Sequence, residues 1–438
     1  MLSKNLVIQT GLVLVCFCTI TGSLLGDFLV GKNRSVHCFG LRLTLSATLF
    51  VAMSLIQVSA ADQDSGAAKK KTIGLVLTSW RTAVYESGDV KAECPDGFHF
   101  DNKENFEKQY STPEARTDFA RQYLYLGPGN IGTNQLVAEQ YLLMRGPNGT
   151  NVGWNPTSVV DPLPLRLVQS KTAYGLNLDG TPDGKATPKS CKHDKFVSPN
   201  GEQGIDNQLY RILGCSTSWR KGGHAVEFHQ TEFTDAKLNR VLIEISNIDD
   251  EKNSDNVIVT FYKGTDAIPM DAVGNRLPWQ SYRMDVRFPQ HIGRARGKIV
   301  NGVLETEPID QYFALSQHTF SMERYLRGMR VRLNLADKTA SAEGFIAGYE
   351  DLARWYENYA RSYSPHVNQI VLWSPPALYA AAQQLADGYP DPKTGQCTAI
   401  SAAYQVNAVR ALIVRPGKDD PLVADGALKL AETTLTRN

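Results

Sequence analysis

Residues 240–262 read RVLIEISNIDDEKNSDNVIVTFY. Two runs rich in β-branched residues, 240–246 and 256–262, flank a polar turn at 247–255. Runs of this kind on either side of a polar turn are typical of a β-hairpin. The segment therefore predicts two adjacent antiparallel strands.

Further strand candidates surround this hairpin, and each is bounded by glycine, proline, asparagine or aspartate. In the last of them, Arg330 and Arg332 alternate with Val331 and Leu333, which gives one polar and one apolar face. Short strands at this spacing predict a mainly β protein, built on an antiparallel β-sandwich of jelly-roll or lectin-like type. The candidates lie at residues 281–288, 297–306, 311–315 and 328–335, with an earlier one at 72–77.

The spacing of apolar residues changes from two to about 3.6 after Gly344, which is the period of a helix. This change predicts a C-terminal helical pair, with one helix from Ile346 to Tyr356 and a second over 376–388. The apolar segment 399–414 is compatible with a strand that returns to the sheet. The predicted organisation is a targeting segment at 1–60, a loop-rich N-terminal region at 61–165, the sandwich at 166–345 and a helical region at 346–438 packed on it.

The N-terminal region carries an export signal. An apolar run from Leu43 to Val58 follows Lys32, Arg34 and Arg42, and small residues close it before Ala61. This pattern predicts a signal peptide at about 32–60 and a periplasmic or secreted bacterial protein. An earlier apolar run at 6–30 is either a membrane anchor or translated sequence ahead of the true start, and we favour the second. Membrane contact is therefore expected only through an uncleaved N-terminus.

Four cysteines follow the expected signal peptide: Cys94, Cys191, Cys215 and Cys397. In an oxidising compartment an even set predicts two disulfides, with three possible connectivities. We favour Cys191 with Cys215, which closes a short loop, and Cys94 with Cys397, which ties the two ends of the mature chain.

Two classes of partner are disfavoured. Residues after 60 carry 42 Lys and Arg against 44 Asp and Glu, so the net charge of −2 argues against a nucleic-acid binder. The GxGxxG match at 127–132 lacks a complete βαβ unit and a following acidic residue. We therefore expect no nucleotide cofactor.

A loop rich in oxygen ligands suggests calcium. Residues 176–184 place Asn177, Asp179 and Asp183 among glycines, and Asp206 and Asn207 could complete the six to eight ligands that calcium takes. The loop lacks the spacing and terminal glutamate of an EF-hand. Because Asp-Gly pairs also form ordinary turns, a plain double turn is the alternative.

Two further features bear on carbohydrate chemistry. Glu305 and Glu307 share one face of a strand, as the acid and the base or nucleophile of a glycosidase do, although a solvated strand face has the same pattern. Arginines near Trp279 and Tyr282 suit recognition of a sugar or an anionic polymer, with salt-bridged strand faces as the alternative. These arginines are Arg283, Arg287, Arg294, Arg296, Arg324, Arg327, Arg330 and Arg332.

Three segments, SKTAYGLNLDGTPDG (170–184), SPNGEQGIDNQLYRILGC (198–215) and LADGYPDPKTGQCTAIS (385–401), resemble a group of large exported bacterial proteins. The resemblance covers most of the mature chain and implies export and a shared fold, but it carries over no catalytic residue. It also implies that the first two segments form one structural centre.

The leading hypothesis is an exported, disulfide-bonded protein that binds a glycan or cell-envelope polymer, with calcium as a possible stabiliser. One alternative is a polysaccharide hydrolase that uses Glu305 and Glu307. The other is a structural component of an envelope complex.

Overall fold

The computed structural model describes residues 70–100, 108, 111–115, 151–159, 163–227, 240–315, 322–335, 340–362 and 374–417. The expected signal peptide, the earlier apolar run and the glycine pattern at 127–132 lie outside these residues. Within them, no helix has the length and apolar character needed to cross a membrane.

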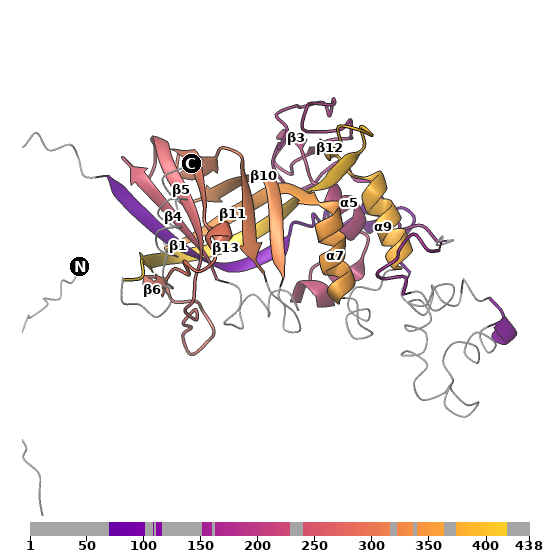
Figure 1. Cartoon of the computed structure of the whole chain (residues 1–438), viewed down its shortest axis with the longest axis horizontal. Coiled ribbons are helices and arrows are strands. Elements are labelled where there is room, and N and C mark those ends of the chain that lie inside the picture. Colours follow the sequence, from indigo (N-terminus) through magenta and orange to yellow (C-terminus); the bar gives the residue numbers. More distant parts are fainter. Residues whose placement is uncertain are drawn as a thin grey trace, which may run out of the picture. The chain divides into compact units, whose positions relative to one another are not determined.

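The main sheet closes on itself. Strand β1 (Lys71–Thr82) pairs antiparallel with β4 (Val241–Ile248) on one side and with β13 (Cys397–Val414) on the other. The sheet runs β1-β4-β5-β7-β8-β10-β11-β13 and returns to β1, so these 8 strands form a closed antiparallel barrel (Figure 1). The other barrel strands are β5 (Ser254–Lys263), β7 (Gly293–Val300), β8 (Val303–Thr306), β10 (Glu323–Asn334) and β11 (Ser341–Asp351).

The predicted sandwich is therefore wrong, whereas the β-rich character is confirmed. Hairpin β4–β5 pairs as expected, but the single strand predicted over 297–306 is a hairpin, β7–β8. Its turn places Asn301 and Gly302 at positive φ, which asparagine and glycine tolerate well. A sandwich and a barrel share the same side-chain period of two, and only the long-range pairing of β1 with β13 distinguishes them.

The first predicted C-terminal helix is wrong in its first half, because β11 extends to Asp351 and α7 (Leu352–Ser362) begins only there. Residues 346–350 are all buried, since the core covers one face of β11 and loops cover the other. A strand buried on both faces loses its alternation and cannot be told from a helix by period. The second helix and the final strand are confirmed as α9 (Pro375–Gln384) and β13.

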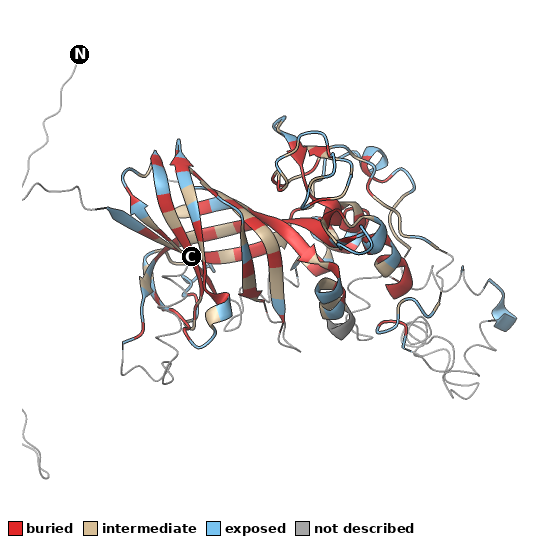
Figure 2. Ribbon diagram, turned by 45° about the horizontal axis from the view of Figure 1, so that its top comes forward, coloured by how far each residue is buried: buried red, intermediate tan, exposed pale blue. Residues whose placement is uncertain are grey.

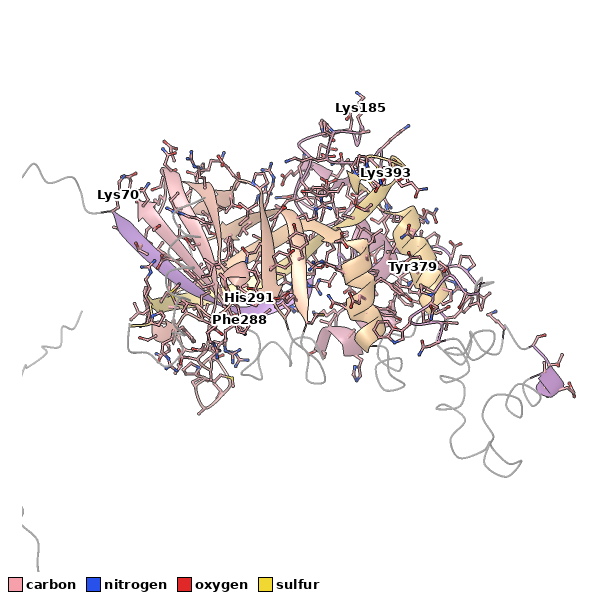
Figure 3. The ribbon with its side chains drawn as sticks, viewed as in Figure 1. Lys70, Lys185, Phe288, His291, Tyr379 and Lys393 are labelled. Atoms are coloured by element: carbon pink, nitrogen blue, oxygen red, sulfur yellow. A yellow bond between two sulfur atoms is a disulfide. The ribbon has the colours of Figure 1, made fainter. Side chains whose placement is uncertain are left out.

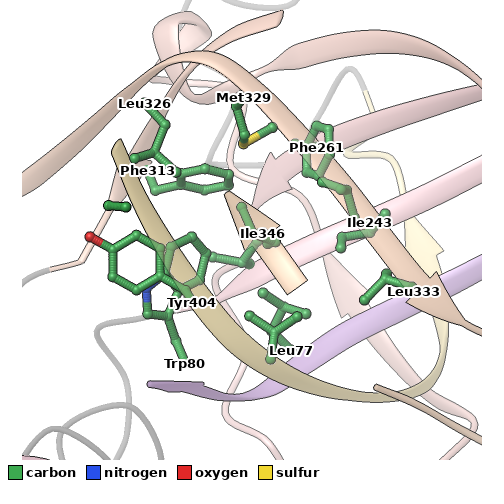
Figure 4. Packing of buried hydrophobic residues seen from close by; sticks show 14 of the residues in the cluster. Leu77, Trp80, Ile243, Phe261, Phe313, Leu326, Met329, Leu333, Ile346 and Tyr404 are labelled. Carbon is green, nitrogen blue, oxygen red and sulfur yellow. The ribbon is translucent and has the colours of Figure 1, made fainter. Parts of the chain in front are cut away.

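Side chains fill the inside of the barrel. Buried and less buried residues alternate along the strands (Figure 2), and the buried set forms one large apolar cluster. The ring of Trp80 lies 5.1 Å from those of both Phe313 and Tyr404, with Ile346 and Leu77 close by (Figure 4). Helices α5 (Gln208–Leu213), α7 and α9 add apolar residues to this cluster. Core side chains therefore occupy the interior of the barrel.

Shorter elements pack around the barrel. β6 pairs in parallel with β13, β9 pairs antiparallel with β10, and β12 pairs with the start of β13. A separate hairpin, β2–β3, lies in the loop region that includes the predicted calcium loop. The bounds are α1 (Val90–Glu93), β2 (Phe196–Val197), β3 (Gln203–Ile205), β6 (Gln280–Arg283), β9 (Ile309–Ala314) and β12 (Gly388–Pro390), with single 3₁₀ turns at Thr217–Trp219 and Pro289–His291.

The four cysteines form two disulfides, as predicted, but neither of the favoured pairs is present. Cys94 bonds to Cys215, and Cys191 bonds to Cys397. The favoured pairing is wrong because Cys215, at the end of α5, packs in the same apolar cluster as Cys94. Cys191 lies instead beside the start of β13, where its N–H donates to the carbonyl of Asp387. Two disulfides suggest an oxidising compartment outside the cytoplasm.

Candidate functional site

Two adjoining pockets on the outside of the barrel form one groove, which we call the outer groove. Their volumes are about 370 and 460 Å³, and Arg332 lines both. The first lies over β5, β7, β8 and β10, and the second over β10, β11, β13 and the end of β1. Charged residues of both signs line the groove: Arg81, Arg296, Lys298, Arg330 and Arg332 against Asp255, Glu305, Glu307 and Glu343.

The pairing of the strands shows which side chains form the floor of the groove. Arg81 is paired with Gln405, Gln405 with Phe345, Phe345 with Arg332, and Arg332 with Glu305. Cross-strand partners point to the same face of a sheet, so these five side chains form a row across five neighbouring strands. The row is polar except for Phe345, whose half-buried ring stacks on that of a neighbouring loop residue, Tyr174, at 5.7 Å.

Arg332 joins the barrel to the loop wall of the groove. Its two terminal nitrogens donate to the carboxylate of Glu202 at 2.6 and 3.0 Å, and its Nε donates to Glu305 at 2.9 Å. The hydrogen bond with Glu202 raises the pKa of Arg332, and burial opposes this rise only in part. The guanidinium therefore fixes the loop that carries Glu202 against β8 and β10.

Other groove side chains keep unused hydrogen-bonding capacity. The Nε atoms of Arg81 and Arg330 are buried, and neither has a hydrogen-bond partner among the described residues. Leaving a buried donor unsatisfied costs about 1–3 kcal/mol. The side chains of Arg296 and Gln405 form no hydrogen bond or ion pair with any residue that the structure describes. Arg296 and Gln405 thus keep donors and acceptors that a ligand can use, whereas the two Nε atoms are themselves closed to solvent.

A second cluster, the buried charge centre, lies behind the loop wall and contains Asp179, His193, Lys195, Asp206 and Asp387. The Lys195 ammonium donates to Asp179 at 2.7 Å and to Asp206 at 2.5 Å. His193 Nε2 lies 2.7 Å from Asp206 and 3.5 Å from Asp387. All five side chains are at most 7% exposed, so this centre is closed to solvent.

The hydrogen bonds define the protonation of the centre. Nδ1 of His193 contacts the carbonyl oxygen of Cys191, and Nε2 contacts a carboxylate, so both ring nitrogens donate. Burial acts to lower the pKa of His193, but the bond to Asp206 and the charge of Asp387 raise it overall. Burial raises the pKa of Asp387 to about 7. With Asp387 protonated, two cations balance two carboxylates.

The centre holds the loop that walls the groove. Burial acts to raise the pKa of Asp179, yet hydrogen bonds from Lys195, Thr181 and Ser190 lower it overall. Asp206 accepts the N–H of Leu178, and Asp387 accepts the N–H of Ser401 on β13. The loop residues that line the groove, Leu176 and Asn177, directly precede these anchors.

The predicted calcium ligands separate in space. Asp179 and Asp206 meet, and with His193 their ligand atoms lie within 4.8 Å of one another, but the ammonium of Lys195 lies between the two carboxylates. Asp183 is exposed and pairs with Lys185 at 2.6 Å. Calcium binding stays a prediction. A calcium ion bound between Asp179 and Asp206 would have to displace the buried ammonium of Lys195.

The two asparagines among the predicted ligands form hydrogen bonds that hold the backbone of the loop region. Asn177 accepts the N–H of Gly180 and donates to the carbonyl of Thr181, as expected for the double turn. Asn207 donates to the carbonyls of Ala83 and Tyr174, and thereby fixes the loop region to the end of β1.

Glu305 and Glu307 both line the groove. Glu305 is held by Arg332 at 2.9 Å and by Lys298 at 3.9 Å, whereas Glu307 has no ion pair among the described residues.

The arginines that the sequence suggested as one surface lie in different places. Arg296, Arg330 and Arg332 line the groove, and others pair locally, as Arg283 does with Asp266, Arg287 with Asp285 and Arg324 with Glu350.

Sequence reasoning missed Arg81, His193, Lys195 and Asp387. His193 and Lys195 stand two apart in the segment CKHDKF, a spacing that places them on one side of an extended chain. Nothing local indicates that their side chains turn toward Asp179 and Asp206 rather than toward water. Asp387 comes from the other end of the chain.

Comparison with known proteins adds no assignment. No family model, curated protein or solved structure matches the chain. Function is therefore inferred from the geometry of the outer groove.

Proposed function

We propose that the protein is an exported bacterial protein of the periplasm or cell exterior, and that its outer groove binds a glycan of the cell envelope. The observation that carries the proposal is the pair of buried, unsatisfied Nε donors of Arg81 and Arg330 in a groove with an aromatic floor residue, Phe345. Both side chains line the groove, so a ligand oxygen that reached either Nε after rotation of the side chain would remove the cost of the unsatisfied donor.

The charges of the groove favour a polyhydroxylated ligand over a strongly charged polymer. Its five cationic side chains face four carboxylates, so the net charge of the lining is small. Sugar hydroxyls both donate and accept, and thus match a surface that presents guanidinium, amide and carboxylate groups together. A nucleic acid would need an excess of positive charge.

A glycan array probed with the full mature chain tests the proposal. We expect binding to neutral or weakly charged oligosaccharides, with loss of signal when both Arg81→Met and Arg330→Met are introduced. Methionine keeps the apolar length of arginine and removes its donors. An array on which the wild-type protein binds no glycan would refute the proposed function.

A polysaccharide hydrolase remains the second candidate because Glu305 and Glu307 lie in the same groove. Release of reducing ends from the array ligands, abolished by Glu307→Gln, would identify an enzyme. Binding that persists for hours with no new reducing ends would identify a binding protein.

A further inference from the structure

A third pocket, of about 620 Å³, opens at the end of the barrel where β1 begins, near Lys70 (Figure 3). It is formed by β1, β4, the last residues of β13 and the residue that precedes β6, Trp279. None of its lining residues lines the outer groove.

Trp279 is the unusual residue of this pocket. It has φ of 63°, a region that bulky side chains rarely adopt, and 58% of it is exposed. Its N–H donates to the carbonyl of Arg410 at 2.6 Å, and the next residue, Gln280, pairs with Ala411 on β13. The barrel thus holds the backbone in a conformation that costs about 1–3 kcal/mol while the indole stays largely in solvent at the pocket.

Every charged side chain of the pocket lining takes part in an ion pair. Lys70 pairs with Asp249, Lys71 with Glu251 at 3.9 Å and Arg410 with Glu251 at 3.2 Å. Glu244, also in the lining, pairs with Arg415 at 3.0 Å. Glu251 is shared by two cations, so the seven paired groups sum to +1, but no charged side chain of the lining is left without an ion-pair partner.

Apolar surface continues from the indole. Leu412 is 53% exposed and lines the same pocket, and Ile413 and Ile73 contribute further carbon atoms. An occupant that fits must therefore present an apolar face to Trp279 and Leu412 and neutral polar groups to the lysines and glutamates. A pyranose ring has both, because its axial C–H groups form one face and its hydroxyls form the edge.

We propose that Trp279 and Leu412 form a second sugar subsite, which stacks the face of a neutral pyranose ring at the β1 end of the barrel. The inference rests on the proposed function for the class of ligand, but it uses none of the groove residues. Glycans that reach both surfaces would bind bivalently and gain avidity without any new contact.

Tryptophan emission of the mature protein, titrated with cellohexaose, chitohexaose and maltohexaose, tests this subsite. We expect at least one hexasaccharide to change the emission, and Trp279→Ala to abolish that change and weaken its binding at least tenfold. Trp279→Phe keeps a ring and should keep affinity within about threefold. Trp154→Ala is the matched control, because Trp154 is similarly exposed at 53% and should leave the Trp279 response intact.

The outcomes separate this inference from the proposed function. If Arg330→Met abolishes binding while Trp279→Ala binds as wild type, glycan binding in the outer groove is supported and the subsite is refuted. If Trp279→Ala alone abolishes binding, the subsite stands and the groove is refuted. A change of emission with oligogalacturonate but with no neutral hexasaccharide would also overturn the subsite.

Discussion

The ammonium of Lys195 lies 2.7 Å from a carboxylate oxygen of Asp179, and both side chains are at most 5% exposed. This ion pair joins two parts of the loop of residues 176–206, and the same ammonium contacts Asp206 in a third part. Two carboxylates and one lysine are thus enclosed where water cannot screen them. The loop wall of the outer groove depends on this arrangement.

Lys195→Met should destabilise the protein strongly. The substitution leaves Asp179 and Asp206 buried without their shared cation, and breaking a buried pair in this way costs about 3–5 kcal/mol. Chemical denaturation measures the change. Lys185→Met is the control, because Lys185 forms its 2.6 Å pair with Asp183 at the surface and should not alter stability measurably. Equal effects of the two substitutions would contradict a structural role for the buried centre.

The contribution of the buried charge centre to stability should decrease as the pH rises from about 4 through 7, whereas His99, whose pKa burial lowers to about 4, acts in the opposite sense up to pH 6.5. The pKa of Asp387 is raised from 3.8 to about 7 by burial, so the folded state retains a proton that the unfolded state releases. Its contribution is complete below pH 3.8 and is lost as the pH passes 7. The pKa of His193 is also raised, so its contribution is lost over a window that begins at 6.5. Asp179, with a lowered pKa, acts oppositely below pH 3.8.

The variant Asp387→Asn isolates the contribution of this carboxyl group to the pH dependence. The amide cannot ionise, and its oxygen can still accept the N–H of Ser401. The melting temperature of the variant, measured relative to wild type at each pH, should therefore increase from pH 4 to 8. Parallel curves would show that Asp387 ionises normally.

Chelation should leave the melting temperature unchanged. The space between Asp179 and Asp206 is occupied by the Lys195 ammonium, and both nitrogens of His193 are committed as donors. A ligand that binds only the folded state must raise its stability, so melting curves with calcium and with excess chelator give a direct comparison. A rise in melting temperature with calcium that chelator reverses would establish the calcium site predicted from the sequence.

Closure of the barrel depends on close approach of β1 and β13 at Gly74. A Cβ at this position would fall against the backbone carbonyl oxygen of Ala411, which cannot move without opening the pairing. Gly74→Val should cost about 1–3 kcal/mol or more, as overpacking does. Gly417→Val is the control, since nothing lies within 4 Å of a Cβ there. Equal denaturation midpoints for the two variants would argue against closure at this seam.

Local patterns predicted much of the secondary structure but not its assembly. The β-branched runs of 240–262 identify β4 and β5 because their turn is local, whereas the partner of β1 lies near the far end of the chain. The spacing of apolar residues wrongly predicted a helix from Ile346, because both faces of β11 are buried there. The oxygen-rich loop correctly drew attention to Asp179 and Asp206, but the approach of Lys195 is a tertiary contact with no signature in the spacing of residues.

The most direct test of glycan binding in the outer groove is calorimetric titration of Arg330→Met with the tightest array ligand. Since Nε of Arg330 is buried without a hydrogen bond among the described residues, the variant should keep or increase the free energy of unfolding. Its affinity should nevertheless fall at least tenfold, while Arg354→Met, an exposed arginine on α7 outside the groove, keeps wild-type affinity. Wild-type affinity in a stably folded Arg330→Met protein would contradict binding in the groove.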